Sequence, residues 1–395
     1  MQYRWLFFPV VLLLLWGYTT QKLKNYSIFQ GWRGNLLIFL GFLWINAWQF
    51  TYRLHLITSN TFAFKFLVWG GSLSLGLWAT FLLFSLSLDL IVLLSRILRR
   101  SVLKEWPLSE ARRNFISRQL PAGFAGISAV FSGFGLRQAL AGPEVQEIEV
   151  PIHDLPEALV GLRIAQISDL HIGPTIHQDY VQNVVKRTLA LGADLIAITG
   201  DLVDGLPEWL KEHTAPLAEL KAPLGVFYVN GNHEYYWGAE AWIKQVRQFG
   251  WTPLINEGRV LEHRTCRFLI AGVTDTSAHQ FIPEHQSSPL RAAETIPEHL
   301  PFRLLLAHRP DSCFEAEKVG FQLQLSGHTH AGQFFPWNLL VRLAHKYPQG
   351  MNQHGKLSLY VNAGTGYWGP AHRLGIPSEI TLIRLAKAAT NSSHA

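Results

Sequence analysis

The feature that most constrains this chain is a thirty-residue apolar run, residues 66–95, in which Asp89 is the one charged residue. A membrane-spanning helix needs about 20 apolar residues, so this run predicts a transmembrane helix with Asp89 near its interfacial end. Two shorter runs precede it, at about residues 5–19 and 36–52, with Trp and Tyr near their ends. A cleaved secretory signal is the other interpretation of the first run, but the later runs favour a multi-pass anchor.

A fourth segment, residues 120–136, is apolar but rich in Gly and Ser, which weakens its hydropathy signal. It follows Arg112 and Arg113, which resemble a twin-arginine export signal, and it precedes residues 139–141, an A-x-A pattern of the kind that signal peptidases cut. We favour the alternative of a basic loop beside an ordinary fourth helix, because Arg pairs beside spans are common. Residues 1–142 are therefore expected to form an anchor of three or four transmembrane helices.

Charge is divided unequally along the chain. Residues 1–142 carry fourteen Lys and Arg against three acidic residues, which is +11 by formal count, whereas residues 143–395 carry −5. Because the positive charge brackets apolar runs, it indicates membrane orientation rather than nucleic-acid binding. The loop at 96–119 holds seven Lys and Arg and is expected to be cytoplasmic. If 120–136 spans, as we expect, the rest of the chain is extracytoplasmic; if it lies along the inner surface, the rest is cytoplasmic.

The pattern changes after Pro143 to alternating strands and helices, which predicts an α/β domain with largely buried sheets over residues 143–386. Helices are expected at 178–191 and 239–249, and a disordered tail at 387–395. Cys266 and Cys313 form neither a disulfide framework nor a cysteine-rich zinc site. The strands are expected at residues 162–168, 194–199, 225–230, 268–273, 303–308, 323–326, 359–363 and 379–385.

Metal-capable side chains follow nearly every expected strand. An isolated His-x-His pair such as His328 and His330 is more often a surface turn than a metal site. Here, however, the other strand ends carry Asp, His and Asn, and in open α/β folds the carboxyl ends of strands meet at one edge. Such a set without thiolates suits Mn, Fe or Zn. The other residues at these strand ends are Asp169, His171, Asp201, Asn232, His233 and His308.

The series "SDLH … GDLVD … GNHE … AHRPD … GHTHAGQ" resembles the calcineurin-like metallophosphoesterase superfamily. The downstream block "YVNAGTGYWGPAHRLGIPSEITLIRL" is similar to its membrane-associated branch, which includes UDP-2,3-diacylglucosamine pyrophosphate hydrolases. The resemblance covers about residues 160–385. It implies an α/β fold of two packed mixed β-sheets flanked by helices, after the N-terminal transmembrane helices. Glu234 stands where Asp is usual and Ala331 where Gly is common, and neither is a ligand position.

The resemblance also implies a catalytic centre with two divalent metal ions. Asp201 would bridge them, and His233 resembles the catalytic histidine of the family; a role as a hydrogen-bonding partner of a ligand is its alternative. Asp204 is expected to be a loop or helix-capping residue. One ion would be held by Asp169, His171, Asp201 and His330, and the other by Asp201, Asn232, His308 and His328.

These features together predict a membrane-anchored phosphoesterase that hydrolyses a phosphodiester or pyrophosphate through a metal-bridging hydroxide. A membrane anchor favours a lipid or other amphiphile as substrate. The alternatives are a UDP-2,3-diacylglucosamine-type hydrolase of lipid A synthesis and an inactive membrane protein that keeps the fold. The expected partners are the lipid bilayer and a lipid-like substrate. Nucleic acid is not expected, because residues 143–395 lack a basic, aromatic-interleaved stretch, and no protein partner is predicted.

Overall fold

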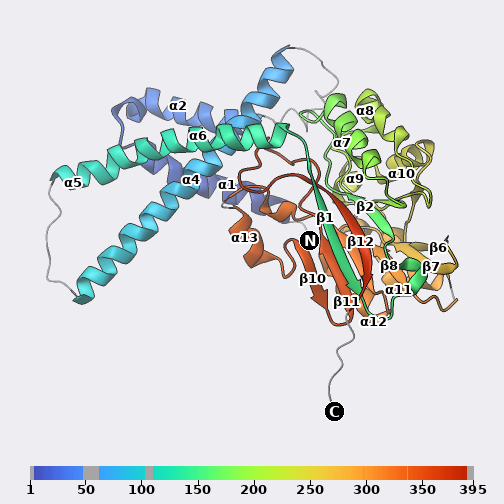
Figure 1. Ribbon diagram of the computed structural model, residues 1–395. Coiled ribbons are helices and arrows are strands. Elements are labelled where there is room, and N and C mark those ends of the chain that lie inside the picture. Colours follow the sequence, from blue (N-terminus) through green and yellow to red (C-terminus); the bar gives the residue numbers. More distant parts are fainter. Residues whose placement is uncertain (1–3, 48–61, 103–109, 297, 336, 389–395) are drawn as a thin grey trace. The chain divides into compact units, whose positions relative to one another are not determined.

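The computed structural model describes residues 4–47, 62–102, 110–296, 298–335 and 337–388 (Figure 1). The chain divides into two compact units. The helical unit comprises residues 1–136 with 370–372, and the sheet unit comprises residues 137–369 with 373–395. This division follows the change of pattern near Pro143 in the sequence.

The described residues before Pro143 are mostly helical, with turns between the helices. One of them, Phe62–Ser95 within α4, is long and apolar enough to cross a membrane, and Gly31–Ile45 is a shorter apolar helix; this count covers only the described helices. Residues 48–52 of the second expected span lie outside the described residues, and a multi-pass anchor stays a prediction. The helices are α1 (Arg4–Leu23), α2 (Gly31–Ile45), α4 (Phe62–Val102), α5 (Glu110–Asn114) and α6 (Leu120–Leu140).

The one acidic residue of the long apolar run is paired. The Asp89 carboxylate accepts hydrogen bonds from Lys22 Nζ at 2.6 Å and from the Tyr18 hydroxyl at 2.9 Å. Both partners belong to α1, which also packs against α2 and α4 around the buried side chains of Ile45, Trp78 and Leu82. Asp89 therefore links helices in the helical unit, which is a structural role.

Residues 110–119, expected as a basic loop, are helical instead. The turn Phe115–Gln119 is π-helical and joins α5 to α6 without a break. Pro121 explains the wider turn, because proline lacks an N–H and its ring would meet the Ser117 carbonyl in a regular α-helix. Residues 103–109 of the expected loop lie outside the described residues.

The sheet unit contains two six-stranded mixed sheets, which confirms the expected α/β fold. The first has the order β1-β12-β2-β3-β4-β5 and is parallel except between β12 and β2. Its strands are β1 (Glu144–Ile152), β2 (Arg163–Ile167), β3 (Leu195–Ile198), β4 (Val226–Tyr228), β5 (Thr252–Pro253) and β12 (Glu379–Lys387).

The second sheet has the order β10-β11-β9-β8-β7-β6, with antiparallel pairs only at its two edges. Because β7, β8, β9 and β11 run parallel, their carboxyl ends lie at one edge. Its strands are β6 (Glu257–His263), β7 (Cys266–Gly272), β8 (Arg303–Leu306), β9 (Leu323–Ser326), β10 (Gly350–His354) and β11 (Leu357–Val361).

Side-chain alternation along the strands builds two hydrophobic layers. In β8, Leu304 and Leu306 lie in the core between the sheets, with Ile164 of β2, whereas Leu305 faces the outer layer. That layer includes residues of α11 (Pro289–Glu294) and α12 (Cys313–Lys318). Successive residues of a strand point to opposite faces, which is why fully apolar runs mark these central strands. The other helices are α7 (Gln178–Ala190), α8 (Pro207–Thr214), α9 (Asn232–Tyr236), α10 (Ala239–Gln248) and α13 (Trp337–Ala344).

All eight expected strands and both expected helices are present, and the sequence analysis missed four strands. These are β1, β5, β6 and β10, which form the four edges of the two sheets. The end of the chain also differs slightly, because Lys387 is the last residue of β12 and pairs with Ile152. Residues 389–395 of the expected tail lie outside the described residues. Cys266 and Cys313 are buried free thiols.

Candidate metal centre

The expected site residues come from the carboxyl ends of strands in both sheets. Asp169 and His171 follow β2, and Asp201 follows β3. Asn232 and His233 begin α9 just after β4, His308 follows β8, and His328 and His330 follow β9. Parallel strands of each sheet deliver these loops to the same edge, so residues up to 161 positions apart in the sequence become neighbours.

The backbone at these loop positions is strained. Non-glycine residues with positive φ are uncommon, and five expected ligands have it: Asp169 (52°), His171 (51°), Asp201 (48°), His328 (74°) and His330 (49°). Such conformations cost about 1–3 kcal/mol each and cluster at functional sites. Two expected ligands follow a glycine because there is no space for a side chain there. A Cβ at Gly231 would lie 2.1 Å from Asp201 Oδ1, and a Cβ at Gly327 would lie 2.1 Å from Asp169 Oδ2.

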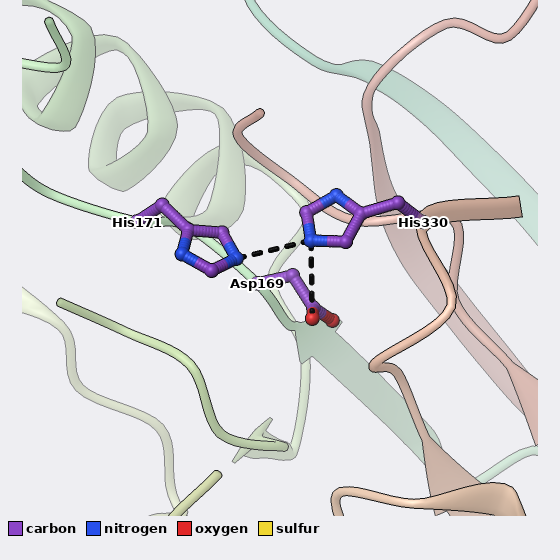
Figure 2. A group of neighbouring side chains, drawn as sticks. All are labelled: Asp169, His171 and His330. Atoms are coloured by element: carbon purple, nitrogen blue, oxygen red, sulfur yellow. Dashed lines mark hydrogen bonds and ion pairs between the residues drawn. The ribbon is translucent and has the colours of Figure 1, made fainter. Parts of the chain in front are cut away.

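Asp169, His171 and His330 form one metal-capable group (Figure 2). His330 Nε2 lies 3.0 Å from His171 Nε2 and 3.4 Å from Asp169 Oδ1. All three residues are buried. Two nitrogens that bind one metal at about 2.1 Å lie about 3.0 Å apart in octahedral and about 3.4 Å apart in tetrahedral geometry, so the spacing of the two imidazoles fits a shared ion.

Asp201, His308 and His328 form a second group. His308 Nε2 lies 3.2 Å from Asp201 Oδ2 and 3.2 Å from His328 Nδ1. The carboxylate of Asp201 also reaches toward the first group, because its Oδ2 is 4.0 Å from His171 Nε2. Its other oxygen, Oδ1, accepts the backbone N–H of His233 at 2.8 Å. Asp201 thus belongs to the second group and also faces the first, as a bridging carboxylate would.

The charges of the centre suit a cation. Burial lowers the pKa of His328 and of His330 well below the usual value, so both rings are neutral and have lone pairs for a metal. Burial also lowers the pKa of His308, but Asp201 outweighs it and raises that pKa to about 10. A proton on His308 therefore balances the carboxylates here, and a divalent ion would displace it. The nitrogen and oxygen donors, without sulfur, fit Mn, Fe or Zn.

Comparison with known proteins agrees with this geometry. Residues 162–332 match the calcineurin-like phosphoesterase family. The chain is 34% identical over 284 residues to an uncharacterized metallophosphoesterase of Helicobacter pylori, covering 70% of this chain and 72% of that protein. This chain belongs to the metallophosphoesterases. It is a member of a family of metal-dependent phosphoesterases with a calcineurin-like fold.

Two relatives of this metallophosphoesterase bear the name "transmembrane protein with metallophosphoesterase domain". The one from Danio rerio is 34% identical over 270 residues, covering 66% of this chain and 62% of that protein. The one from Bos taurus is 35% identical over 280 residues, covering 68% of this chain and 63% of that protein. The matched stretch thus spans less than two thirds of these two relatives.

Asp204 has a different role in this metallophosphoesterase from the one expected. It lies in the loop after β3 but caps no helix; one carboxylate oxygen lies 3.0 Å from His171 Nδ1 and the other contacts His233 Nδ1. Asp204 thereby orients the expected ligand His171 and the expected catalytic histidine together. Its position three residues after Asp201 in "GDLVD" was a signal that the sequence analysis assigned to a turn.

Glu234, which is not an expected ligand, holds the backbone of two site loops. Its buried carboxylate accepts three backbone N–H groups: Asp201 at 3.1 Å, Leu202 at 2.6 Å and Gly231 at 2.6 Å. Burial is the first cause that raises its pKa, to about 7. Glu234 therefore fixes the two loops that carry Asp201 and Asn232 against each other.

Asn232 is brought to the same edge with the other expected ligands. It is buried at the start of α9, where its Oδ1 accepts from Arg309 Nη2 at 3.4 Å and its Nδ2 donates to the Tyr236 hydroxyl at 3.4 Å. Arg309 is itself held by Asp275, whose Oδ2 lies 2.7 Å from Arg309 Nε. The sequence analysis assigned no role to Arg309, although it follows His308 directly in "AHRPD".

Proposed function

We propose that this protein is a membrane-anchored, dinuclear-metal phosphoesterase that hydrolyses a phosphodiester or pyrophosphate of a lipid or other amphiphile. The observation that carries the proposal is a pair of metal-capable groups linked by a third group, His171, Asp201 and His233, which shares His171 with the first and Asp201 with the second. We assign Asp169, His171, Asp201 and His330 to one ion. We assign Asp201, Asn232, His308 and His328 to the other, with Mn, Fe or Zn as the metal.

The side chains around these groups support catalysis. A pair of bound ions would lower the pKa of a water molecule and neutralise phosphoryl oxygens. His233 Nε2 lies 3.8 Å from Asp201 Oδ2, next to both groups, so it can deliver a proton to the leaving oxygen. Arg309, which is paired with Asp275, contacts Asn232 and holds it beside the second group. All expected ligand positions are filled, so the inactive-protein alternative has no support.

The first test is metal dependence. We expect the purified full-length protein to hydrolyse bis(p-nitrophenyl) phosphate, to lose this activity in EDTA, and to regain it with Mn²⁺ or another divalent ion. Elemental analysis of the reactivated protein should find two ions per chain. Activity that persists after complete removal of metal would refute the proposal.

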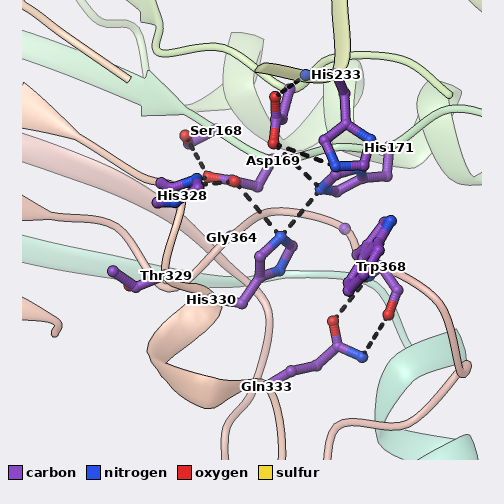
Figure 3. A network of polar contacts seen from close by, with 12 residues as sticks. Ser168, Asp169, His171, His233, His328, Thr329, His330, Gln333, Gly364 and Trp368 are labelled. Carbon is purple, nitrogen blue, oxygen red and sulfur yellow. Dashed lines mark hydrogen bonds and ion pairs between the residues drawn. The ribbon is translucent and has the colours of Figure 1, made fainter. Parts of the chain in front are cut away.

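Aromatic side chains around His233 support an apolar substituent on the leaving group. The His233 ring lies 5.7 Å from the Trp368 ring and 5.2 Å from the Tyr236 ring, between centroids, and both aromatics are exposed. Trp368 is fixed by its backbone: its N–H donates to Gln333 Oε1 at 2.8 Å and its carbonyl accepts from Gln333 Nε2 at 2.9 Å (Figure 3). Exposed, positioned aromatics beside a general acid favour a substrate with apolar groups.

Helix α13 supports a lipid surface as the source of that substrate. It packs on the turn His330–Gly332, which carries one of the expected ligands. Its apolar residues Leu339, Leu340 and Leu343 are exposed, and no residue of α13 is buried. The exposed basic residues Arg342 and Lys346 lie in or beside it. A short helix with exposed leucines and flanking basic residues suits insertion into the headgroup region of a bilayer.

The Leu343→Glu variant tests the lipid substrate. Leu343 is 85% exposed, so the change should not disturb the fold. We expect hydrolysis of phospholipid vesicles to fall about tenfold or more, because burying one Leu in the bilayer contributes about 1.5–3 kcal/mol. Hydrolysis of bis(p-nitrophenyl) phosphate should stay unchanged. The matched control is Leu290→Glu, at an exposed leucine of α11. An equal loss in both variants, or unchanged vesicle hydrolysis in Leu343→Glu, would contradict the lipid proposal.

The membrane anchor is supported by three observations. Phe62–Ser95 is long and apolar enough to span, two relatives are named transmembrane proteins, and the helical unit exposes large apolar side chains such as Phe39, Leu90 and Ile91. We retain the proposal of a multi-pass protein of the cell membrane whose catalytic domain is extracytoplasmic. A reporter fused after Ala386 that is active only outside the cytoplasm is the expected result; cytoplasmic activity would reverse the orientation. No observation in the described residues favours a UDP-2,3-diacylglucosamine hydrolase, which we do not propose.

A further inference from the structure

Arg373 is a buried cation next to the metal centre, with no role in the proposed function. Its side chain has no exposed surface, and none of the ion pairs among the described residues involves it. Burial lowers its pKa to about 10, which leaves it charged at neutral pH. Burying a charge without a carboxylate partner is costly unless its hydrogen-bond donors are satisfied by other groups.

The guanidinium of Arg373 is satisfied by a loop and by one expected metal ligand. Nη1 donates to the Ala363 carbonyl at 2.7 Å, and Nε donates to the Gly366 carbonyl at 3.1 Å. Nη2 lies 3.1 Å from His330 Nδ1. This contact determines which edge of the His330 ring faces the centre, because it leaves Nε2 toward Asp169 and His171.

The 363–366 loop that Arg373 holds in turn grips Asp169. The Gly366 N–H donates to the Asp169 carbonyl at 3.0 Å, and the Thr365 N–H donates to the Ser168 carbonyl at 2.7 Å. Thr365 Oγ1 also accepts the Ser168 N–H at 3.2 Å. Asp169 has a positive φ, and such a conformation persists only where its surroundings fix it. Arg373 therefore acts on Asp169 through the loop and on His330 directly.

Gly364 lies beside His330 (Figure 3) and in close contact with Arg373. A Cβ at Gly364 would lie 2.7 Å from Arg373 Nη2 and 2.9 Å from His330 Nδ1, and its φ is +91°. Any larger residue would push the guanidinium and the ring apart. This close approach accounts for the first glycine of "NAGTG" in the downstream sequence block.

The other metal-capable group is fixed by different residues. Asp201 is held by Glu234 through its backbone N–H, and His308 Nδ1 lies 2.8 Å from the Thr199 carbonyl. The contacts of Arg373 within the described residues involve the 363–366 loop and His330. Asp201 and His308 thus have supports that do not involve Arg373, whereas the His328 N–H donates to the Asp169 carboxylate oxygens at 3.0 Å.

We propose that Arg373 is the positioning residue for the half of the metal centre formed by Asp169, His171 and His330. It fixes the His330 ring directly and the Asp169 backbone through the 363–366 loop. Asp201 and His308 of the other half are held without it, and that half contacts Asp169 directly through the His328 N–H. This inference rests on the proposed dinuclear centre.

The test is metal binding by the full-length protein in detergent, compared between wild type and Arg373→Met. Methionine has a similar length but neither charge nor donors. Mn²⁺ binding is measured by equilibrium dialysis with elemental analysis, and the spin state by electron paramagnetic resonance. Wild type should bind two ions with a spin-coupled spectrum. In Arg373→Met, one ion should bind about 10–100-fold more weakly, the usual effect of losing a residue that orients a ligand. The remaining ion should give the spectrum of isolated Mn²⁺. The matched control is Arg384→Met, at an exposed arginine of β12 paired with Glu147.

The outcomes distinguish a failure of the Arg373 inference from a failure of the proposed dinuclear centre. Two ions bound by Arg373→Met with wild-type affinity would overturn the inference and leave the proposed function intact, as would equal weakening of both ions. If circular dichroism shows that Arg373→Met does not fold, Arg373→Lys takes its place. Lysine keeps the charge but cannot contact the loop carbonyls and His330 together, so selective loss of one ion supports the inference and retention of both overturns it. A wild-type protein that binds fewer than two ions would refute the dinuclear centre, and the inference with it.

Discussion

Replacing Asp201 by Asn should remove both activity and metal. Asp201 Oδ2 is the oxygen that faces His308 at 3.2 Å and His171 at 4.0 Å, so it is the carboxylate available to both ions. Asparagine has a similar shape but lacks the negative charge that offsets two divalent cations. Bound ions contribute several kcal/mol of charge stabilisation in the transition state, so we expect turnover to fall by about 10³-fold or more.

The measurement compares hydrolysis and metal content of Asp201→Asn with those of Asp179→Asn. Asp179 is an exposed residue in the first turn of α7, so its replacement removes the same charge away from the centre. The control should keep two ions and wild-type turnover. Wild-type activity in Asp201→Asn would show that the bridging role is wrong. One retained ion with no activity would place Asp201 in a single site.

The strands that sequence patterns identified are those buried on both faces and paired on both sides. Leu304–Leu306 of β8 form an apolar run because neighbouring residues face different hydrophobic layers, and all four residues of β9 are buried although Gln324 and Ser326 are polar. The missed edge strands pair on one side only and carry polar residues, as in the partly exposed β1 and β10. Edge strands are under weaker selection for continuous apolar runs, so a pattern of buried runs does not detect them.

The residues of the candidate site also fall into two classes, those that the sequence predicted and those that it did not. The expected ligands were recognisable because the sequence itself shows both their side-chain types and their positions after predicted strands. Asp204 and Arg373 were not recognised, because their roles depend on partners distant in sequence: Asp204 contacts His171, 33 residues away, and Arg373 contacts His330, 43 residues away. Both residues contact expected ligands, and the spacing of residues along the sequence does not indicate which distant side chains they contact.

Removing the imidazole of His233 should slow the reaction without removing metal. His233 has two candidate roles, general acid and metal ligand, because it also forms a metal-capable group with His171 and Asp201. As a general acid, His233→Ala should lower turnover by about 10²- to 10⁴-fold and retain two ions. His279→Ala, at an exposed histidine, is the control. Loss of an ion from His233→Ala, measured by elemental analysis, would make His233 a ligand instead.

The pH dependence provides an independent test through Asp204. Burial lowers the pKa of His233, but Asp201 and Asp204 outweigh it and raise that pKa to about 9, which keeps the ring protonated at neutral pH. Bound ions would offset the charge of Asp201, so Asp204, which contacts His233 Nδ1, becomes the carboxylate that sustains the raised value. An acid that must be protonated loses activity as pH rises through its pKa. Asp204→Asn should therefore shift the alkaline limb of the kcat profile to lower pH while both ions stay bound. An unchanged alkaline limb in Asp204→Asn would mean that His233 is not the group that protonates the leaving oxygen.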